Sequence, residues 1–116
     1  MESFSAALIL KALDGLSLRS IATAQNIANA NTLGYRPLKV TFEEALAHAA
    51  ANGLNEVSKV TPKISPAVDE YGGVGMRLDL ELATASATAG RYGALVEVLN
   101  RQLQVHAIAQ IGRAHV

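Results

Sequence analysis

The chain lacks cysteine and tryptophan and carries no excess of charge of either sign. The absence of cysteine excludes a disulfide framework and thiol chemistry. Ten basic and ten acidic residues cancel, so the chain shows no basic surplus of the kind that nucleic-acid binders carry. At 116 residues it has room for one domain.

Long apolar runs are missing as well. No stretch approaches the roughly 20 apolar residues that a membrane-spanning helix needs. Residues 4–10 are apolar, but Glu2 precedes them and Lys11 ends them, and neither a basic start nor a small-residue cleavage site is present. We therefore expect an N-terminus that is not removed as a secretory signal.

Aromatic residues are scarce, at 4% of the chain, although half of all residues are apolar. Many of the apolar residues are alanine, which buries little area, so one thick core is not expected. Small side chains do allow helices to approach closely. The composition therefore favours helix packed on helix.

The first long pattern, at residues 3–30, predicts a helix that is apolar around much of its circumference. Its charges are limited to Lys11, Asp14 and Arg19. Such a helix needs contacts on several sides, and one partner helix cannot cover it. Its apolar and small residues form two neighbouring stripes, Leu10, Leu13, Ser17, Ile21, Ala24 and Ala28, and beside them Ile9, Leu16 and Ile27.

A polar stretch at 26–36, with the sequence NIANANTLGYR, ends this helix. Gly34 suits a left-handed or turn conformation, and the proline after Arg36 favours extended chain over 34–40. The cluster of Asn26, Asn29, Asn31 and Thr32 has two compatible interpretations. Its side chains can replace backbone partners in a turn, or their amides can bond to neighbouring chains.

A short helix is predicted at 42–52. Thr41 and Glu44 have the spacing of a capping box, and Asn52-Gly53 ends the pattern. Phe42, with Ala45, Leu46 and Ala49, would form its apolar face. Residues 54–76 contain Pro62 and Pro66 and show no regular pattern, so a short edge strand near 57–61 and disorder both remain open.

The second long helix is predicted at 79–112, followed by a tail at 113–116. Its length of about 48 Å exceeds what a small compact domain needs. Gly90 and Gly93 cost helix propensity, roughly 1 kcal/mol each, and would allow another helix to approach closely. Its apolar stripe follows alternating steps of three and four residues, as in a coiled coil: Leu82, Ala85, Ala89, Tyr92, Val96, Leu99, Leu103 and His106.

Candidates for chemistry are weak. His48, His106 and His115 do not have metal-ligand spacing. The adjacent carboxylates Glu43/Glu44 fit the capping box, and Asp69/Glu70 lie in a glycine-rich segment. No serine lies in a G-x-S-x-G setting, and the glycines of 71–75 do not follow a strand and open a helix as a phosphate loop does. We expect no enzyme, no cofactor and no bound metal.

The stretch NIANANTLGYR at 26–36, followed by Phe42-Glu43, resembles the N-terminal signature of bacterial flagellar rod and hook proteins. That family carries an Asn-Ile-Ala-Asn run, then Asn/Asp-Thr-x-Gly-Tyr and a later phenylalanine. Leu33 stands where the family usually has proline. The stretch RYGALVEVLNRQL at 91–103 resembles the family's closing helix. The resemblance covers roughly 3–42 and 78–112, and it is strongest for the proximal rod proteins.

The resemblance implies a structural subunit of the flagellar basal-body rod, the drive shaft that transmits torque and encloses the export channel. Such subunits leave the cell unfolded through the flagellar type III apparatus, without signal cleavage, and pack their terminal helices as concentric layers of a tube. The implied partners are other copies of the chain, rod proteins of the FlgC, FlgF and FlgG types, and the adaptor FliE, with the MS ring and export gate nearby. The implied location is the periplasmic rod, without nucleic acid or a membrane span.

The expected fold is therefore all-α. Two long helices, in segments 1–33 and 79–112, would form a coiled-coil-like hairpin, and an irregular middle at 34–78 would hold one short helix. The alternatives are a FlgC-type rod protein, a soluble coiled-coil adaptor or export chaperone and, much less favoured, a peptidoglycan-cutting enzyme. The residues expected to make assembly contacts are Leu10, Leu13, Ile21, Asn26, Ile27, Asn29, Thr32, Gly34, Tyr35, Phe42, Tyr92, Val96, Leu99 and Leu103.

Overall fold

The computed structural model describes residues 3–68 and 76–114, and its first element is the predicted long helix, α1 (Phe4–Ala28). The helix begins after Ser3, whose Oγ accepts a hydrogen bond from the Ala6 N–H at 3.0 Å. It ends at Asn29, whose N–H donates back to the carbonyls of Gln25 and Ile27. The predicted span of 3–30 is confirmed to within two residues at its end.

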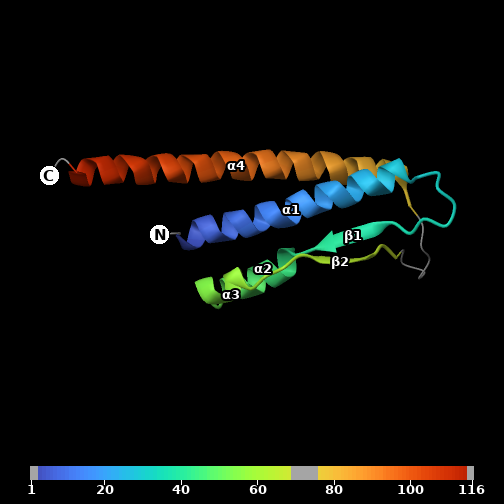
Figure 1. The fold of residues 1–116 in the computed structure, drawn as a ribbon, viewed down its shortest axis with the longest axis horizontal. Helices are drawn as coiled ribbons and strands as arrows, with labels where there is room; N and C mark the ends of the chain where they lie inside the picture. The colour runs from blue at the N-terminus through green and yellow to red at the C-terminus, as the bar shows by residue number, and fades with distance from the viewer. Residues whose placement is uncertain (1–2, 69–75, 115–116) are drawn as a thin grey trace.

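The second long helix, α4 (Leu78–Ala114), runs antiparallel to α1 along one side of the molecule (Figure 1). It is 37 residues long and continues through Gly112, where we expected it to end. The chain is elongated as a result, at 66 × 26 × 17 Å. Within the described residues, no helix is both long and apolar enough to cross a bilayer.

The middle of the chain is folded where the sequence predicted mostly irregular structure. Strand β1 (Leu38–Thr41) pairs antiparallel with β2 (Lys63–Pro66), with Leu38 opposite Pro66 and Val40 opposite Ile64. Two short helices, α2 (Glu43–Ala50) and α3 (Leu54–Ser58), connect them. The strand considered near 57–61 thus lies at 63–66 instead, and α3 was not predicted. The chain is mostly helical with a small sheet, rather than all-α.

The predicted capping box at the start of α2 is wrong. The residue before the helix is Phe42, and no side-chain hydrogen bond caps the first turn. Thr41 is instead the last residue of β1 and pairs with Lys63. Because Thr41 is paired within the sheet, its hydroxyl does not accept a hydrogen bond from the first turn of α2. Glu43 and Glu44 still lie in the first turn, where the helix dipole favours negative charge.

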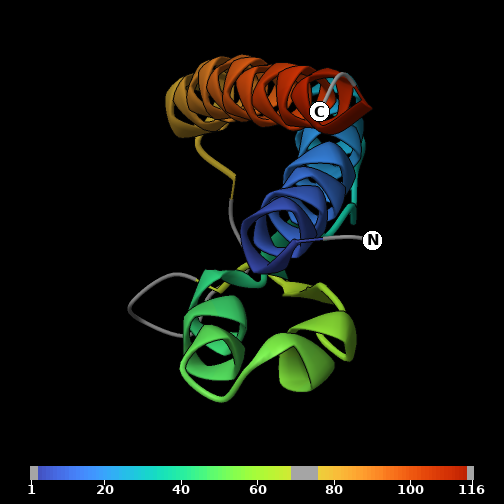
Figure 2. The same ribbon diagram turned by 90° about the vertical axis from the view of Figure 1, so that its left-hand side faces the viewer.

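The hydrophobic core lies mainly between α1 and the folded middle. In Figures 1 and 2, α1 lies between α4 on one side and the strands, α2 and α3 on the other. Phe42 fits against Gly15 so closely that a Cβ built on Gly15 would lie 2.4 Å from the ring. The middle therefore supplies the second covering that an apolar α1 needs. The core residues are Ala7, Leu16, Ala22, Val40, Phe42, Leu46, Ala49 and Val57.

Helix α4 lies along α1 but adds little to the hydrophobic core. It buries one residue fully, Thr88, and the partly buried Leu95 is its contribution to the core cluster. Figure 2 shows why: α1 and α4 meet near the end of α1 and diverge toward its start. We call the inward-facing residues of α4 the inner seam; they are Glu81, Ala85, Thr88, Leu95, Val96, Leu99 and Gln102.

The inner seam is rotated from the predicted coiled-coil stripe. Ala85, Val96 and Leu99 of that stripe face inward, but Leu82, Tyr92 and Leu103 are 52%, 41% and 56% exposed. In a straight α-helix, residues spaced by seven rotate by about 20° per heptad around the helix axis. A stripe with a seven-residue repeat therefore turns gradually away from a partner helix that does not supercoil with it. From residue 103 onward every described residue of α4 is exposed.

Candidate functional site

The described residues contain no group of three or more histidine, cysteine, aspartate or glutamate side chains placed to hold a metal ion. His48 and His106 are exposed on separate helices. His115 and the segment 69–75, with Asp69/Glu70 and the glycine-rich turn, lie outside the described residues. The main features of the described residues are the helix turn at 26–36, an arginine bridge and a groove.

Asn26 joins three parts of the chain. Its amide nitrogen donates to the Leu38 carbonyl at 2.9 Å and to the Glu81 Oε2 at 3.2 Å. Its amide oxygen accepts from the Tyr35 hydroxyl at 2.8 Å and from the Leu38 N–H at 2.9 Å. Both donors and both acceptor positions of the amide are thus filled, and the side chain is fully buried.

The position of Asn26 explains its residue type. Leu38 lies opposite Pro66, so its N–H and C=O point away from β2 toward α1. An amide side chain carries its donors and its acceptor on separate atoms, so Asn26 can donate to the Leu38 carbonyl and accept from the Leu38 N–H at once. Asn26 therefore holds β1 against the end of α1, and its Glu81 contact adds the first turn of α4. Its role in this structure lies within the chain, as the turn interpretation predicted.

The rest of the asparagine-rich stretch forms an ordered turn. Thr32 donates from its hydroxyl to the Asn29 Oδ1 at 3.0 Å, and the Asn29 amide donates to the Gln25 carbonyl at 2.9 Å. Gly34 has a φ of 80°, the left-handed conformation that the sequence predicted. Leu33, at the tip of the turn, is fully exposed, which gives the end of the molecule an apolar projection.

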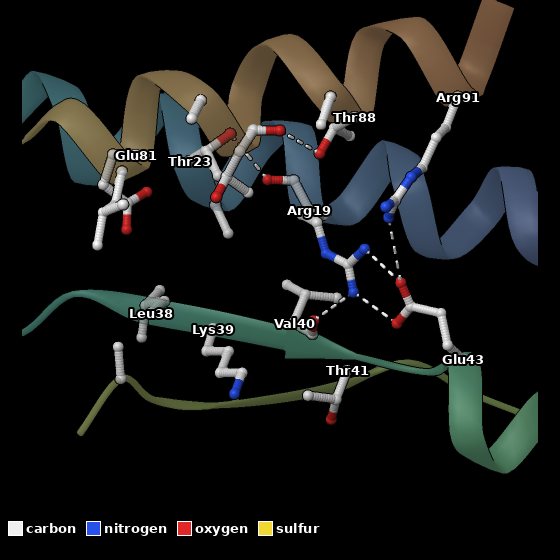
Figure 3. Close-up of a pocket in the computed structure, with 16 residues that line it drawn as sticks. Arg19, Thr23, Leu38, Lys39, Val40, Thr41, Glu43, Glu81, Thr88 and Arg91 are labelled. Carbon is white, nitrogen blue, oxygen red and sulfur yellow. Dashed lines mark hydrogen bonds and ion pairs between the residues drawn. The ribbon is translucent and has the colours of Figure 1, made fainter. Parts of the chain in front are cut away.

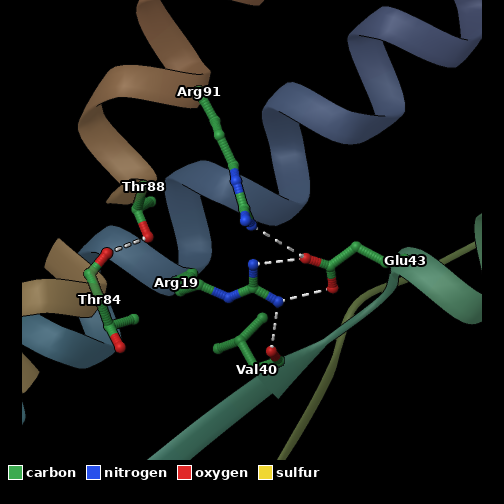
Figure 4. A network of polar contacts seen from close by, with 6 residues as sticks. All are labelled: Arg19, Val40, Glu43, Thr84, Thr88 and Arg91. Carbon is green, nitrogen blue, oxygen red and sulfur yellow. Dashed lines mark hydrogen bonds and ion pairs between the residues drawn. The ribbon is translucent and has the colours of Figure 1, made fainter. Parts of the chain in front are cut away.

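An arginine bridge that sequence reasoning missed connects α1 to β1 and α2 (Figure 4). Both terminal nitrogens of Arg19 donate to the Glu43 carboxylate, at 2.6 and 2.7 Å, and one also donates to the Val40 carbonyl at 2.7 Å. The guanidinium lies 5.0 Å from the centre of the Phe42 ring, within cation–π distance. Arg91 of α4 approaches the same carboxylate at 4.0 Å.

The bridge changes the chemistry of Glu43. Hydrogen bonding to the Arg19 guanidinium, aided by its charge, lowers the pKa of the Glu43 carboxyl to about 2. One signal for this pair was visible in the sequence, because Arg19 is one of only three charged residues in α1. The partner on α2 could not be identified, since it depends on the strand that turns the chain back.

A groove of about 640 Å³ lies between α4, α1 and β1 (Figure 3). Small residues of α4, Ala83 and Ala87, form one wall together with Leu80. The opposite wall is β1, and Arg19, Glu43 and Arg91 lie at one end. The groove thus combines small apolar residues of α4 with charged side chains from α1, β1, α2 and α4.

The predicted contact residues divide into three groups. The buried group consists of Leu13, Asn26 and Phe42. Two pairs of predicted residues are hydrogen-bonded to each other, Asn26 with Tyr35 and Asn29 with Thr32. The α1 residues that line a cavity with Tyr92 are Leu16 and Ser17, from the two predicted stripes, and Ser20, which belongs to neither. Those half-buried are Ile27, Asn29, Tyr35, Val96 and Leu99; those exposed are Leu10, Ile21, Thr32, Gly34, Tyr92 and Leu103.

No protein-family model matches the chain, and no curated protein matches it either.

Proposed function

We propose that the chain is a structural subunit of the bacterial flagellar basal-body rod, of the proximal FlgB type. The observation that carries the proposal is the amount of apolar surface that the two long helices leave exposed. Leu10 and Ile21 on α1 are 42% and 54% exposed, and Tyr92 and Leu103 on α4 remain 41% and 56% exposed. Side chains of this kind along two long helices mark contacts with other chains.

In the proposed rod, α1 and α4 pack as coiled coils against the same helices of neighbouring copies. Repeating one heterologous contact around a screw axis builds a tube. The ordered turn at 29–35 and the Asn26 contacts would hold the folded middle at a constant angle to the tube-forming helices. The expected neighbours are further copies, rod proteins of the FlgC, FlgF and FlgG types and the adaptor FliE, close to the MS ring and export gate in the periplasm.

The proposal is tested by deleting the gene in its own bacterium and restoring it with variants. Leu103→Asp places a charge on an exposed apolar position, and Gln104→Asp places the same charge one residue away. We expect motility to be lost with Leu103→Asp and kept with Gln104→Asp. Basal bodies isolated from the deletion strain should lack the rod. Normal rods in that strain would refute the proposal.

Two alternatives share these features and differ in their assembly. A FlgC-type subunit would occupy another level of the same rod, so a density map of the basal body distinguishes it. A soluble coiled-coil adaptor or export chaperone would form a small, closed oligomer and would be absent from the basal body. The specific observation that favours a closed oligomer is the second apolar face of α4, described next.

A further inference from the structure

Helix α4 carries a second stripe of mainly apolar residues, on a different face from the inner seam; its first half borders the groove and its second half is open to solvent. Its members follow steps of three and four residues, as helix-packing faces do. Every one of them is exposed. We call this stripe the outer seam; it consists of Leu80, Ala83, Ala87, Gly90, Ala94, Val98, Arg101, Val105, Ile108 and Gly112.

The outer seam changes in size along its length. Its first half has small residues at Ala83, Ala87, Gly90 and Ala94. Its second half has large ones, and Val98, Val105 and Ile108 are 43%, 67% and 69% exposed. A Cβ added at Gly90 would meet no atom within 4 Å, so no packing contact among the described residues explains the glycine there. Glycine costs a helix about 1 kcal/mol relative to alanine.

We infer that the outer seam binds the outer seam of a second copy of this chain, with the two α4 helices antiparallel. In that arrangement Ala87 lies opposite Val105 of the second copy, and Ala94 lies opposite its Val98. Ala83 meets the second copy's Ile108 in the same way. Large side chains thus face small ones along the whole seam, which is how facing layers interdigitate at high density. A parallel pair would set alanine against alanine and valine against valine.

The groove and the free end of α4 match in length. Residues 80–91 of α4 form the groove wall, and residues 103–114 project beyond α1 and are exposed, with no other described segment beside them (Figure 1). Each segment is 12 residues long, or roughly 18 Å. In the antiparallel pair, the free end of each copy enters the groove of the other. Gly90 leaves room for the stem of the second copy's Arg101, whose charged end can then reach solvent.

The contact is large enough to be stable. The outer seam spans residues 80–112, and two such helices would bury on the order of 1,500 Å² in total, in the range of specific interfaces. The pairing is isologous, so it closes on itself and makes a dimer, not a filament. The dimer uses the outer seam, whereas the rod contacts proposed above use Tyr92 and Leu103 of α4, which lie outside that seam, so the two proposals can fail separately.

Sedimentation of the full chain over a range of concentrations tests the association. We expect a monomer–dimer equilibrium in the micromolar range, typical of a modest interface. Val105→Glu should raise the dissociation constant about 100-fold, since it places a charge against Ala87. Gln104→Glu, which adds the same charge off the seam, should leave it unchanged. A wild-type chain that stays monomeric at about 0.5 mM overturns the inference.

Disulfide cross-linking tests the orientation, without background because the chain has no cysteine. The pair Ala87→Cys with Val105→Cys should form a covalent dimer on mild oxidation, while neither single variant should. The two positions are roughly 27 Å apart along one helix, so they cannot link within a chain. If Ala87→Cys alone links as fast as the pair, the helices are parallel and the inference is wrong. Association into larger, open species overturns it as well.

Discussion

At the scale of single residues, two glycines of similar appearance in the sequence have opposite roles. Gly15 lies under the Phe42 ring, where a Cβ would come within 2.4 Å of the ring carbons. Gly90 faces open space in the middle of α4. Packing against Phe42 requires a glycine at position 15, whereas no contact among the described residues requires one at position 90.

We therefore expect Gly15→Ala to destabilise the fold by about 2 kcal/mol, because the buried ring must move to admit the methyl group. Gly90→Ala should stabilise it by about 1 kcal/mol, because alanine is the better helix former. Urea denaturation of both variants, at concentrations where the chain is monomeric, measures the two changes. A Gly15→Ala variant as stable as the wild type would show that Phe42 does not pack as described.

Replacing Asn26 should lower the free energy of unfolding strongly, because its buried amide makes four hydrogen bonds. Asn26→Leu keeps the approximate volume but leaves the N–H and C=O of Leu38 and the Tyr35 hydroxyl without their partner. Unsatisfied buried groups cost about 1–3 kcal/mol each, so we expect a loss of about 3 kcal/mol in the free energy of unfolding. The matched control is Asn31→Leu, at an exposed position of the same stretch, which should change it by less than about 0.5 kcal/mol.

At the scale of elements, the bridge between α1 and α2 makes stability depend on pH. The pKa of Glu43 is about 2 in the folded chain, against an ordinary value of 4.5. A lowered pKa means that the pair stabilises the fold fully above about 4.5 and loses its effect as the pH falls toward 2. Because Glu43 is about half exposed, we expect only about 1 kcal/mol from it.

Denaturation of the wild type and of Glu43→Gln at pH 6 and at pH 2 isolates this contribution. The two proteins should differ by about 1 kcal/mol at pH 6 and by only a small fraction of that at pH 2, where Glu43 is about half protonated in the folded chain and almost fully protonated in the unfolded one. Glu44→Gln, one residue along and exposed, should follow the wild type at both values. An equal difference at both pH values would mean that the carboxylate charge is not what Arg19 recognises.

Among the elements of the fold, the long helices and the turn could be predicted from the sequence, and the small sheet could not. Both long helices follow from periodicity and from the low charge of α1, and the turn at Gly34 follows from glycine chemistry. The folded middle did not follow, because β1 and β2 are four residues each and acquire stability from their pairing, from the burial of Val40 and from Asn26 and Arg19. Such long-range contacts leave no local pattern. The stripe predicted on α4 coincides only in part with the inner seam, because periodicity identifies an apolar face without showing what covers it.

At the scale of the molecule, α1 and the folded middle contain nearly all of the hydrophobic core, and α4 packs on α1 along only part of its own length. The attachment ends near Gln102, since residues 103–114 are all exposed. An isolated helical segment of 12 residues is marginal in water, so this end should fray in the single chain. A second copy, or a rod neighbour, would supply the missing contacts.

Truncation separates the two parts of α4. A chain that ends at Gln102 loses no contact with its own core, so at monomeric concentrations its free energy of unfolding should stay within about 0.5 kcal/mol of the full chain. A chain that ends at Arg91 also loses the partly buried Leu95, Val96 and Leu99, and should be destabilised by about 3 kcal/mol. Sedimentation of the chain ending at Gln102 should show a monomer throughout, because Val105 and Ile108 are gone. If that shorter chain still dimerises with the affinity of the full one, the free end of α4 is not what holds two copies together.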